Sequence, residues 1–167
     1  MYDAVLAGCR WLENTPWGAT IRASSWMYPV ALWIHFVGLS VWLATSVAVD
    51  LRLMGVGPRR QTAGELSQGL FAWNWIGFGV AFLGGFLLLS AEATTYVTNT
   101  GFRLKLAVLT PLALVWHLVV QRKTPTWTGR DHTPAIGKWA GSFELVLWIS
   151  VTAASVGFLL TNAVTHP

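Results

Sequence analysis

The chain has 167 residues, which is enough for one domain. Apolar residues make up 54% of it and charged residues 11%, against roughly 25% charged residues in a typical soluble domain, so the composition indicates a membrane protein. The formal net charge of +4 does not indicate a nucleic-acid partner, because Lys and Arg lie between the apolar segments and form no basic stripe.

The N-terminal part reads as a short amphipathic helix lying in the membrane interface, with Val5, Cys9 and Leu12 on one face. Thr15, which precedes a proline, is suited to start a second short helical turn. Cys9 is the chain's single cysteine, so an internal disulfide is excluded.

Four later stretches are apolar and long enough to cross a hydrocarbon core about 30 Å thick. All four should be helices, because lipid offers no partner to an unpaired backbone group. The predicted fold is therefore all-α, an integral membrane four-helix bundle with a short N-terminal interfacial helix. The predicted segments are 1–25 for the interfacial part and 26–164 for the bundle, with spans at about 26–49, 70–91, 104–121 and 142–164.

Lys and Arg predict the orientation, because cytoplasmic loops carry the excess of these residues. Seven follow the first and third predicted spans, and four lie on the other side, which places both termini in the periplasm of a bacterial inner membrane. The seven are Arg52, Arg59, Arg60, Arg122, Lys123, Arg130 and Lys138, and the four are Arg10, Arg22, Arg103 and Lys105.

Most of the eleven tryptophans fall near the predicted interfaces, where Trp is enriched. Four lie deeper and must pack against something, namely Trp33, Trp42, Trp116 and Trp148.

The second predicted span carries small residues every four positions, Gly77, Ala81 and Gly85. This spacing lets a neighbouring backbone or a flat ligand approach closely, and helix packing is the favoured interpretation.

His35 is the one ionisable residue between positions 26 and 49, and an ionisable group inside a membrane span is a candidate functional residue. Ala31 and Gly38 lie on its helical face, with Trp42 one turn beyond. Two small residues beside an imidazole predict a slot for a flat ligand.

His117 repeats this pattern in the third predicted span, with Ala113 one turn before it. The first and third spans run in the same direction, so both histidines can face the bundle interior, where two imidazoles could ligate a haem iron. The sequence therefore predicts haem b with His35 and His117 as metal ligands and Gly38, Ala113 and Trp42 as further contacts. Two axial histidines leave iron no open position, which predicts electron transfer.

The depths of the two histidines differ by about 10 Å at 1.5 Å of helix rise per residue. A kink at Pro111 would reduce this difference. Otherwise each histidine serves a different ligand, one alone binds iron, or both are hydrogen-bonded to neighbouring helices. His132 and His166 are expected to be solvated.

Other polar residues of the predicted spans have structural interpretations. Asp50 and Arg52 are expected to form an interfacial anchor with a local ion pair. Glu144 opens the fourth span, where the helix dipole favours a carboxylate. Asn74 is expected to hydrogen-bond a neighbouring helix in preference to a quinone.

The segment "YPVALWIHFVGLSVWLATSVAVDLRLMG" and the later "TNTGFRLKLAVL" resemble a family of small bacterial four-helix membrane proteins, itself distantly similar to copper-resistance D and cytochrome-b-type membrane proteins. The resemblance implies paired intramembrane histidines that hold haem b, whereas a copper role has little support from the residues. The positions that carry it are Pro29, His35, Gly38, Asp50, Arg52, Gly55, Asn99, Phe102, Lys105 and His117.

The leading functional prediction is a membrane electron-transfer subunit that binds haem b and links quinone with a periplasmic redox partner. Such a protein would be a subunit of an oxidoreductase complex with other membrane or periplasmic subunits, and would not be catalytic alone. The alternative is a cofactor-free membrane anchor or scaffold subunit, which would associate with a partner through the Gly77/Gly85 face. A small-solute transporter is disfavoured, because four short helices with two histidines form a poor path.

Overall fold

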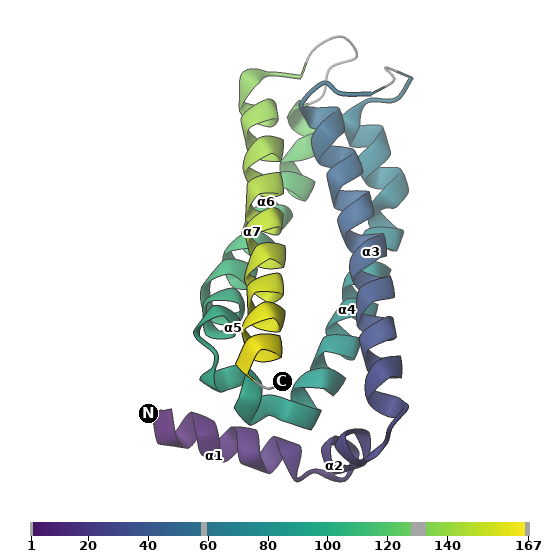
Figure 1. The fold of residues 1–167 in the computed structure, drawn as a ribbon. Helices are drawn as coiled ribbons and strands as arrows, with labels where there is room; N and C mark the ends of the chain where they lie inside the picture. The colour runs from purple at the N-terminus through teal and green to yellow at the C-terminus, as the bar shows by residue number, and fades with distance from the viewer. Residues whose placement is uncertain (1, 58–59, 128–132, 166–167) are drawn as a thin grey trace.

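The structure is a computed structural model that describes residues 2–57, 60–127 and 133–165, with side chains described up to residue 155. Within these ranges the chain is helical and contains no strand, which confirms the all-α prediction (Figure 1). The elements are α1 (Tyr2–Glu13), α2 (Pro16–Ala23), α3 (Met27–Leu53), α4 (Ala63–Thr98), α5 (Thr100–Leu104), the π-helix η1 (Lys105–Leu109), α6 (Thr110–Trp127) and α7 (Ala135–Thr165).

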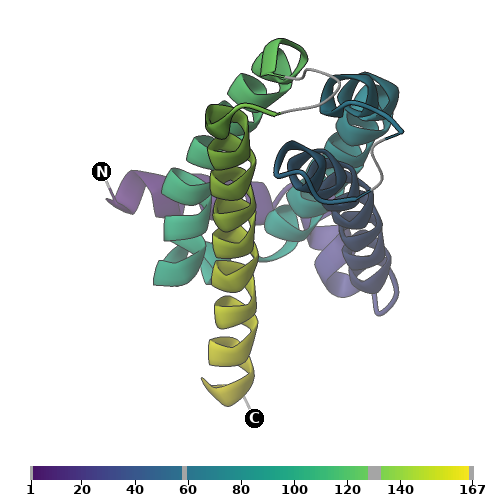
Figure 2. The same ribbon diagram turned by 90° about the horizontal axis from the view of Figure 1, so that it is seen from above.

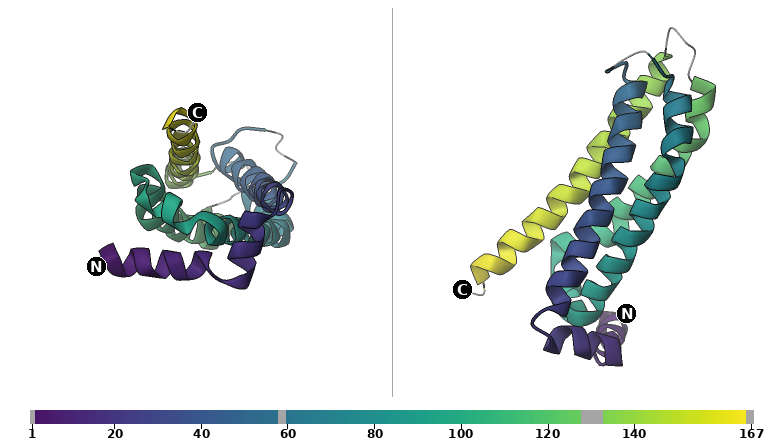
Figure 3. Two further views of the ribbon diagram at one scale, coloured as in Figure 1. Left: turned by 60° about the horizontal axis from the view of Figure 1, so that its bottom comes forward. Right: turned by 90° about the vertical axis from the view of Figure 1, so that its right-hand side faces the viewer.

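Helices α3, α4, α6 and α7 lie together as an elongated bundle, and α1 and α2 lie across one end of it (Figures 1 and 3). We call α1 and α2 the apron, and the opposite end, where α3 joins α4 and α6 joins α7, the loop end. The start of α1 and the end of α7 both lie at the apron end. Among the residues that the structure describes, three helical stretches are long and apolar enough to cross a membrane: Met27–Leu53, Ala63–Thr98 and Thr100–Trp127.

Helices α3 and α4 pack with their backbones in close contact, side by side in the view from above (Figure 2). A Cβ atom added to Gly38 would lie 2.2 Å from the Ala81 nitrogen, and one added to Gly77 would lie 2.7 Å from the Trp42 nitrogen. The packing interpretation of the small residues in α4 is thus confirmed for Gly77 and Ala81, both of which are buried.

Helix α3 ends in a glycine-dependent motif. Gly55 has φ +89°, a conformation that L side chains rarely adopt. Its N–H donates to the Arg52 carbonyl at 3.1 Å, and the Val56 N–H donates to the Leu51 carbonyl at 2.8 Å. This pattern satisfies the last carbonyls of α3 and explains why a glycine follows the Asp-Leu-Arg-Leu sequence.

Helix α4 is interrupted at Glu92, whose φ of −140° and ψ of 39° are not helical. The apron caps both broken ends. Glu13 accepts a hydrogen bond from the Thr94 N–H at 2.7 Å, and Arg22 donates to the Ala91 carbonyl at 3.0 Å. A carboxylate at a helix start and a guanidinium at a helix end both have the sign that the helix dipole favours.

The second apron helix starts where the sequence predicted. Thr15 is its N-cap, and its hydroxyl accepts a hydrogen bond from the Gly18 N–H at 3.3 Å.

The π-helix η1 lies directly before Pro111, where the sequence allowed a kink. The Thr110 N–H donates to the Lys105 carbonyl, five residues earlier. Because a proline ring crowds the carbonyl four residues before it, one wider turn lets the helix continue into α6.

Three of the four deep tryptophans pack as predicted. Trp42 and Trp148 are buried with ring centroids 4.3 Å apart, and the Trp116 indole N–H donates to the Ala140 carbonyl at 3.1 Å. Trp33 makes no such contact within the described chain. Its side chain is 70% exposed, because it lies on a face of α3 that no described helix covers.

Candidate functional site: a buried polar network around His117

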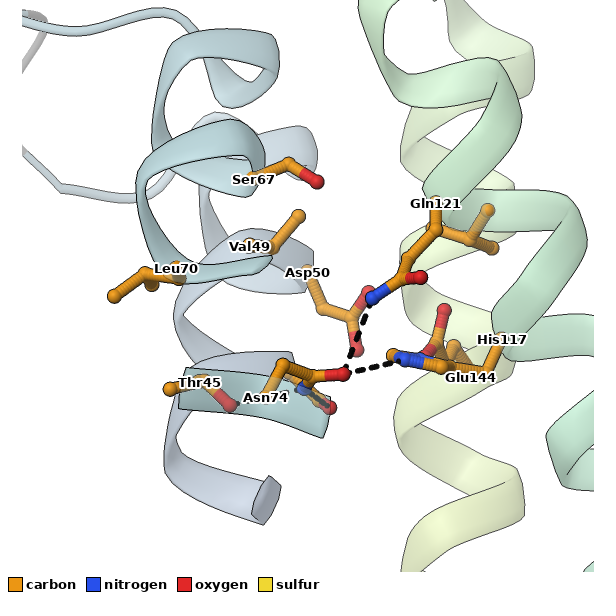
Figure 4. A pocket seen from close by; sticks show the side chains of 11 residues that line it. Thr45, Val49, Asp50, Ser67, Leu70, Asn74, His117, Gln121 and Glu144 are labelled. Atoms are coloured by element: carbon orange, nitrogen blue, oxygen red, sulfur yellow. Dashed lines mark hydrogen bonds and ion pairs between the residues drawn. The ribbon is translucent and has the colours of Figure 1, made fainter. Parts of the chain in front are cut away.

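The polar side chains of α3, α4, α6 and α7 meet in the loop half of the bundle and line a small cavity (Figure 4). Its apolar lining comes from Val49, Leu70 and Val120. Its polar lining comes from Thr45, Ser46, Asp50, Ser67, Asn74, His117, Gln121 and Glu144.

Asn74 is held in one orientation by α3. Its Nδ2 atom donates to the Trp42 carbonyl at 3.3 Å, to the Thr45 hydroxyl at 2.9 Å and to the Ser46 hydroxyl at 2.9 Å. Because a carbonyl oxygen only accepts, the amide nitrogen must be the atom that faces α3. The Asn74 Oδ1 atom therefore faces α6. The prediction that Asn74 hydrogen-bonds a neighbouring helix is confirmed.

Gln121 fixes the same orientation independently. The indole N–H of Trp75 only donates, so the Gln121 atom 3.1 Å from it must be Oε1. The other amide atom of Gln121, Nε2, then donates to Asn74 Oδ1 at 3.1 Å.

His117 is buried and has a partner on each ring nitrogen. Its Nε2 lies 2.9 Å from Asn74 Oδ1 and must carry a proton, because that oxygen only accepts. Its Nδ1 is hydrogen-bonded to Glu144 Oε1, which also accepts from the Trp148 indole N–H at 3.3 Å. One proton therefore lies between His117 and Glu144, either on the carboxyl group beside a neutral imidazole or on an imidazolium beside a carboxylate.

Asp50 is 1% exposed and lies in the bundle interior, so the predicted interfacial anchor is wrong for this residue. The expected ion pair with Arg52 is not formed, because the Arg52 Nε–H instead donates to the Gln61 carbonyl at 2.7 Å. Within the described ranges, Asp50 Oδ2 and Glu144 Oε2 are buried oxygens without a hydrogen-bond partner. For Glu144 the sequence predicted a structural role at the start of its helix, but not the hydrogen bond to His117.

His35 lies in the apron half with a different environment. Its Nδ1 donates to the Ala81 carbonyl at 2.6 Å. A Cβ atom added to Gly84 would lie 2.5 Å from the backbone nitrogen of His35, and one added to Gly85 would lie 3.1 Å from the His35 ring. In the described part of the chain, no hydrogen bond from the protein reaches its Nε2.

The two histidines therefore bind different parts of α4. His35 is bonded at Ala81 and His117 at Asn74, seven residues apart, which is about 10 Å along a helix. Both nitrogens of His117 are engaged, so in this arrangement it offers none to an iron atom. The predicted pair of axial ligands does not fit the donor set at His117.

The three other residues predicted to contact haem are packed against protein. Gly38 contacts α4 at Ala81. Ala113 and Trp42 are buried together in one apolar cluster with Leu147 and Trp148. Close helix packing accounts for the small residues at these positions.

Sequence reasoning found His117 but not the residues that bind it. One signal was available. The rule that singled out the histidines, an ionisable group within a span, applies equally to Glu144 near the start of the fourth span.

Four residues with sequence-based expectations lie outside the described ranges: Arg59, Arg130, His132 and His166.

The single thiol of the apron belongs to Cys9. Burial and the nearby Glu13 carboxylate raise the pKa of this thiol, which disfavours a thiolate nucleophile. Within the described parts, no three His, Cys, Asp or Glu side chains are grouped to hold a metal ion. Comparisons with known protein families, curated proteins and solved structures gave no match.

Proposed function

We propose that the chain is an integral membrane protein whose four long helices cross the bilayer. Large apolar side chains are exposed along the bundle, with Trp33 70%, Phe82 66% and Ile149 66% accessible. A water-soluble surface rarely exposes so much contiguous apolar area. Helix α7 has 31 residues and a length of about 46 Å, which exceeds the hydrocarbon thickness.

The apron is proposed to lie in the periplasmic interface of a bacterial inner membrane, with both termini on that side. Its exposed aromatic side chains, Trp11 at 69% and Trp17 at 45%, suit the headgroup region, as does Trp26 at the start of α3, which is 64% exposed. The excess of Lys and Arg at the loop end supports a cytoplasmic location for that end.

Inside this bundle, we propose that His117 and Glu144 hold an exchangeable proton and make the chain a proton-carrying membrane subunit. One observation carries the proposal: the orientations of Asn74 and Gln121 place a proton on His117 Nε2 and a second, shared proton between His117 and Glu144. Intramembrane His and Glu side chains are characteristic of proton relays, because burying them otherwise costs free energy without return.

Infrared spectroscopy of the protein in lipid nanodiscs tests this proposal. Transfer of the wild-type sample into heavy water should shift the carboxyl and carboxylate bands of the buried pair, because its shared proton is replaced by deuterium. Glu144→Gln should remove these changes, and His117→Asn should shift them. Asp3→Asn, at an exposed apron carboxylate, is the matched control and should leave them in place. A Glu144→Gln spectrum that matches wild type would refute the proposal.

Haem b binding by His35, with electron transfer between quinone and a periplasmic redox partner, is the second candidate. One observation favours it. The His35 Nδ1–H donates to the Ala81 carbonyl, as the outer nitrogen of a metal-ligating histidine commonly does, and its Nε2 is left for a ligand. Bound haem would supply electron transfer. His117 does not provide a second axial nitrogen in this arrangement.

The visible spectrum of purified protein, expressed with added haem and reduced with dithionite, tests the second candidate. Reduced b-type bands in wild type that disappear in His35→Ala and persist in His117→Ala would support ligation by His35 alone. No bands in wild type would exclude haem binding.

A cofactor-free scaffold subunit was expected to use the Gly77 face for association with a partner. In the structure Gly77 packs against Trp42 of α3 in the same chain. That face is therefore not available to a partner, and this version of the scaffold hypothesis loses its proposed contact.

A further inference from the structure

The cavity beside the His117–Glu144 pair has a second buried carboxyl group on its wall. Asp50 projects from α3 toward His117 and Glu144 (Figure 4). Asp50 and Glu144 are each 1% exposed, and each has one oxygen, Oδ2 and Oε2, without a hydrogen-bond partner in the described structure. Buried acceptors without a partner usually bind a water molecule or an ion.

Gly141 brings the two carboxyl groups together. A Cβ atom added to it would lie 3.0 Å from the Asp50 carbonyl oxygen and 3.4 Å from the Asp50 Cα. Glu144 follows one helical turn later and lies on the same face of α7. The close contact between α3 and α7 at this glycine thus holds Glu144 beside Asp50.

The cavity is closed toward the apron. There the Trp42 ring packs against Phe78 and Trp148, with centroid distances of 4.8 and 4.3 Å, and Leu147 is buried beside them. Its lining on the other side includes the partly exposed Gln121. A second buried cluster, made of Leu53, Ala63, Val120 and Ala140, closes the cavity toward the loop end, so solvent reaches it most directly beside Gln121.

The charged groups around Asp50 come from two helices. Helix α6 contributes His117 and α7 contributes Glu144, whereas α4 lines the cavity with uncharged side chains only. Arg52, the nearest cation on α3, is bonded to the Gln61 carbonyl. Two carboxyl groups thus line one cavity with a single imidazole, and a full negative charge on both would be unfavourable in this interior.

We propose that Asp50 relays the proton between the His117–Glu144 pair and solvent beside Gln121, through a water molecule held between the two carboxyl groups. The space available is of the order of one water molecule. When the pair gives its proton to the water and is left as a neutral imidazole beside a carboxylate, the water gives another proton to the Asp50 carboxylate. An N–H or O–H bond of the pair and an O–H bond of the water break, a new O–H bond forms on the water and one on Asp50, and nothing is oxidised. Asp50 then gives its proton to a solvent water molecule beside Gln121. This inference rests on the proposed proton-carrying function.

Hydrogen–deuterium exchange of the Glu144 signal, followed by infrared spectroscopy after transfer of nanodiscs into heavy water, tests the relay. In Asp50→Asn the signal should persist but exchange about tenfold more slowly or slower, because the side chain can no longer accept and release a proton. Asp50→Glu should restore exchange. Ser67→Ala, which removes a hydroxyl from the same cavity wall without removing a titratable group, should exchange at the wild-type rate.

The outcomes separate the two proposals. If Glu144→Gln removes no exchanging signal, the proton-carrying function itself fails. If the signal is present and exchanges at the wild-type rate in Asp50→Asn, the relay fails and the function stands. Equal slowing in Ser67→Ala and Asp50→Asn would also overturn the relay, because any loss of a polar wall group would then suffice. If Asp50→Asn does not fold, Asp50→Ser, which also lacks a titratable group, gives the same decision.

Discussion

His35 and His117 lie on helices that run in the same direction, yet the bundle accommodates their rings in different ways. Around His35 the backbones of α3 and α4 are in contact, and one carbonyl accepts its hydrogen bond. Around His117 the contacts are side chain to side chain, drawn from α4, α6 and α7. One region is held by close packing and the other by a hydrogen-bond network, so the same residue type depends on different neighbours for its stability.

The largest effect is expected at Gly84. Gly84→Ala places a methyl group 2.5 Å from the backbone nitrogen of His35. Separating α3 and α4 to relieve this contact should cost about 3 kcal/mol. The free energy of unfolding in detergent micelles measures it. Gly79→Ala, at a glycine of α4 with no atom within 4 Å of the added Cβ, is the control. Equal stability of the two variants would show that packing does not hold the His35 region.

Asn74→Ala should have the next largest effect. It removes the amide that joins the α3 hydroxyls to His117 and leaves buried partners unsatisfied, at a cost of about 2 kcal/mol. Unfolding in micelles measures the loss, and Gln68→Ala, at an exposed amide of α4, is the control. Nitrogen NMR spectra should show that His117 Nε2 no longer always carries a proton, because its acceptor has been removed. A variant as stable as wild type would contradict the network description.

A smaller effect is expected at the apron. Glu13→Gln keeps an acceptor for the Thr94 N–H but removes the charge, which should cost about 1 kcal/mol. The measurement is the midpoint of the transition in which the apron separates from α4, detected by proteolysis of nanodisc samples. Asp3→Asn is the control. Loss of the His117 signals in this variant would be unexpected, because it would mean that the two regions are not independent.

The smallest effect is expected for Trp75→Phe. It removes the indole N–H that orients Gln121 and should cost about 0.5 kcal/mol. The chemical shifts of the Gln121 amide report the change, with Trp73→Phe, at an indole 59% exposed, as the control. If the Gln121 amide stays fixed, the contact to Asn74 is sufficient to orient it.

The sequence predicted the helices better than their ends. The predicted first span stops at residue 49, and because α3 continues to Leu53, Asp50 lies inside the bundle rather than at its edge. The second span was predicted from residue 70, whereas α4 starts at Ala63. A capping box between Thr62 and Glu65 marks this start, and its Thr-x-x-Glu pattern was readable in the sequence.

The site could be predicted only in part. Its central histidine follows from the cost of an ionisable group in a span. Its partners depend on how α6 and α7 are rotated about their axes, which is set by contacts such as Gly141 with Asp50. No local pattern in the sequence fixes that rotation. The proposed haem pairing assumed that two small-residue faces meet a ligand, whereas Gly38 meets Ala81 of α4.

The interruption of α4 at Glu92 has a consequence for synthesis. Glu13 and Arg22 cap groups that lie 81 and 69 residues later in the chain. In the membrane arrangement that we propose, the apron therefore has no docking position until α4 has been made and its far end has reached the apron side of the membrane. Arrival of α4 and docking of the N-terminal helices become one event, which makes the apron a reporter of whether the first hairpin has been inserted in the correct orientation.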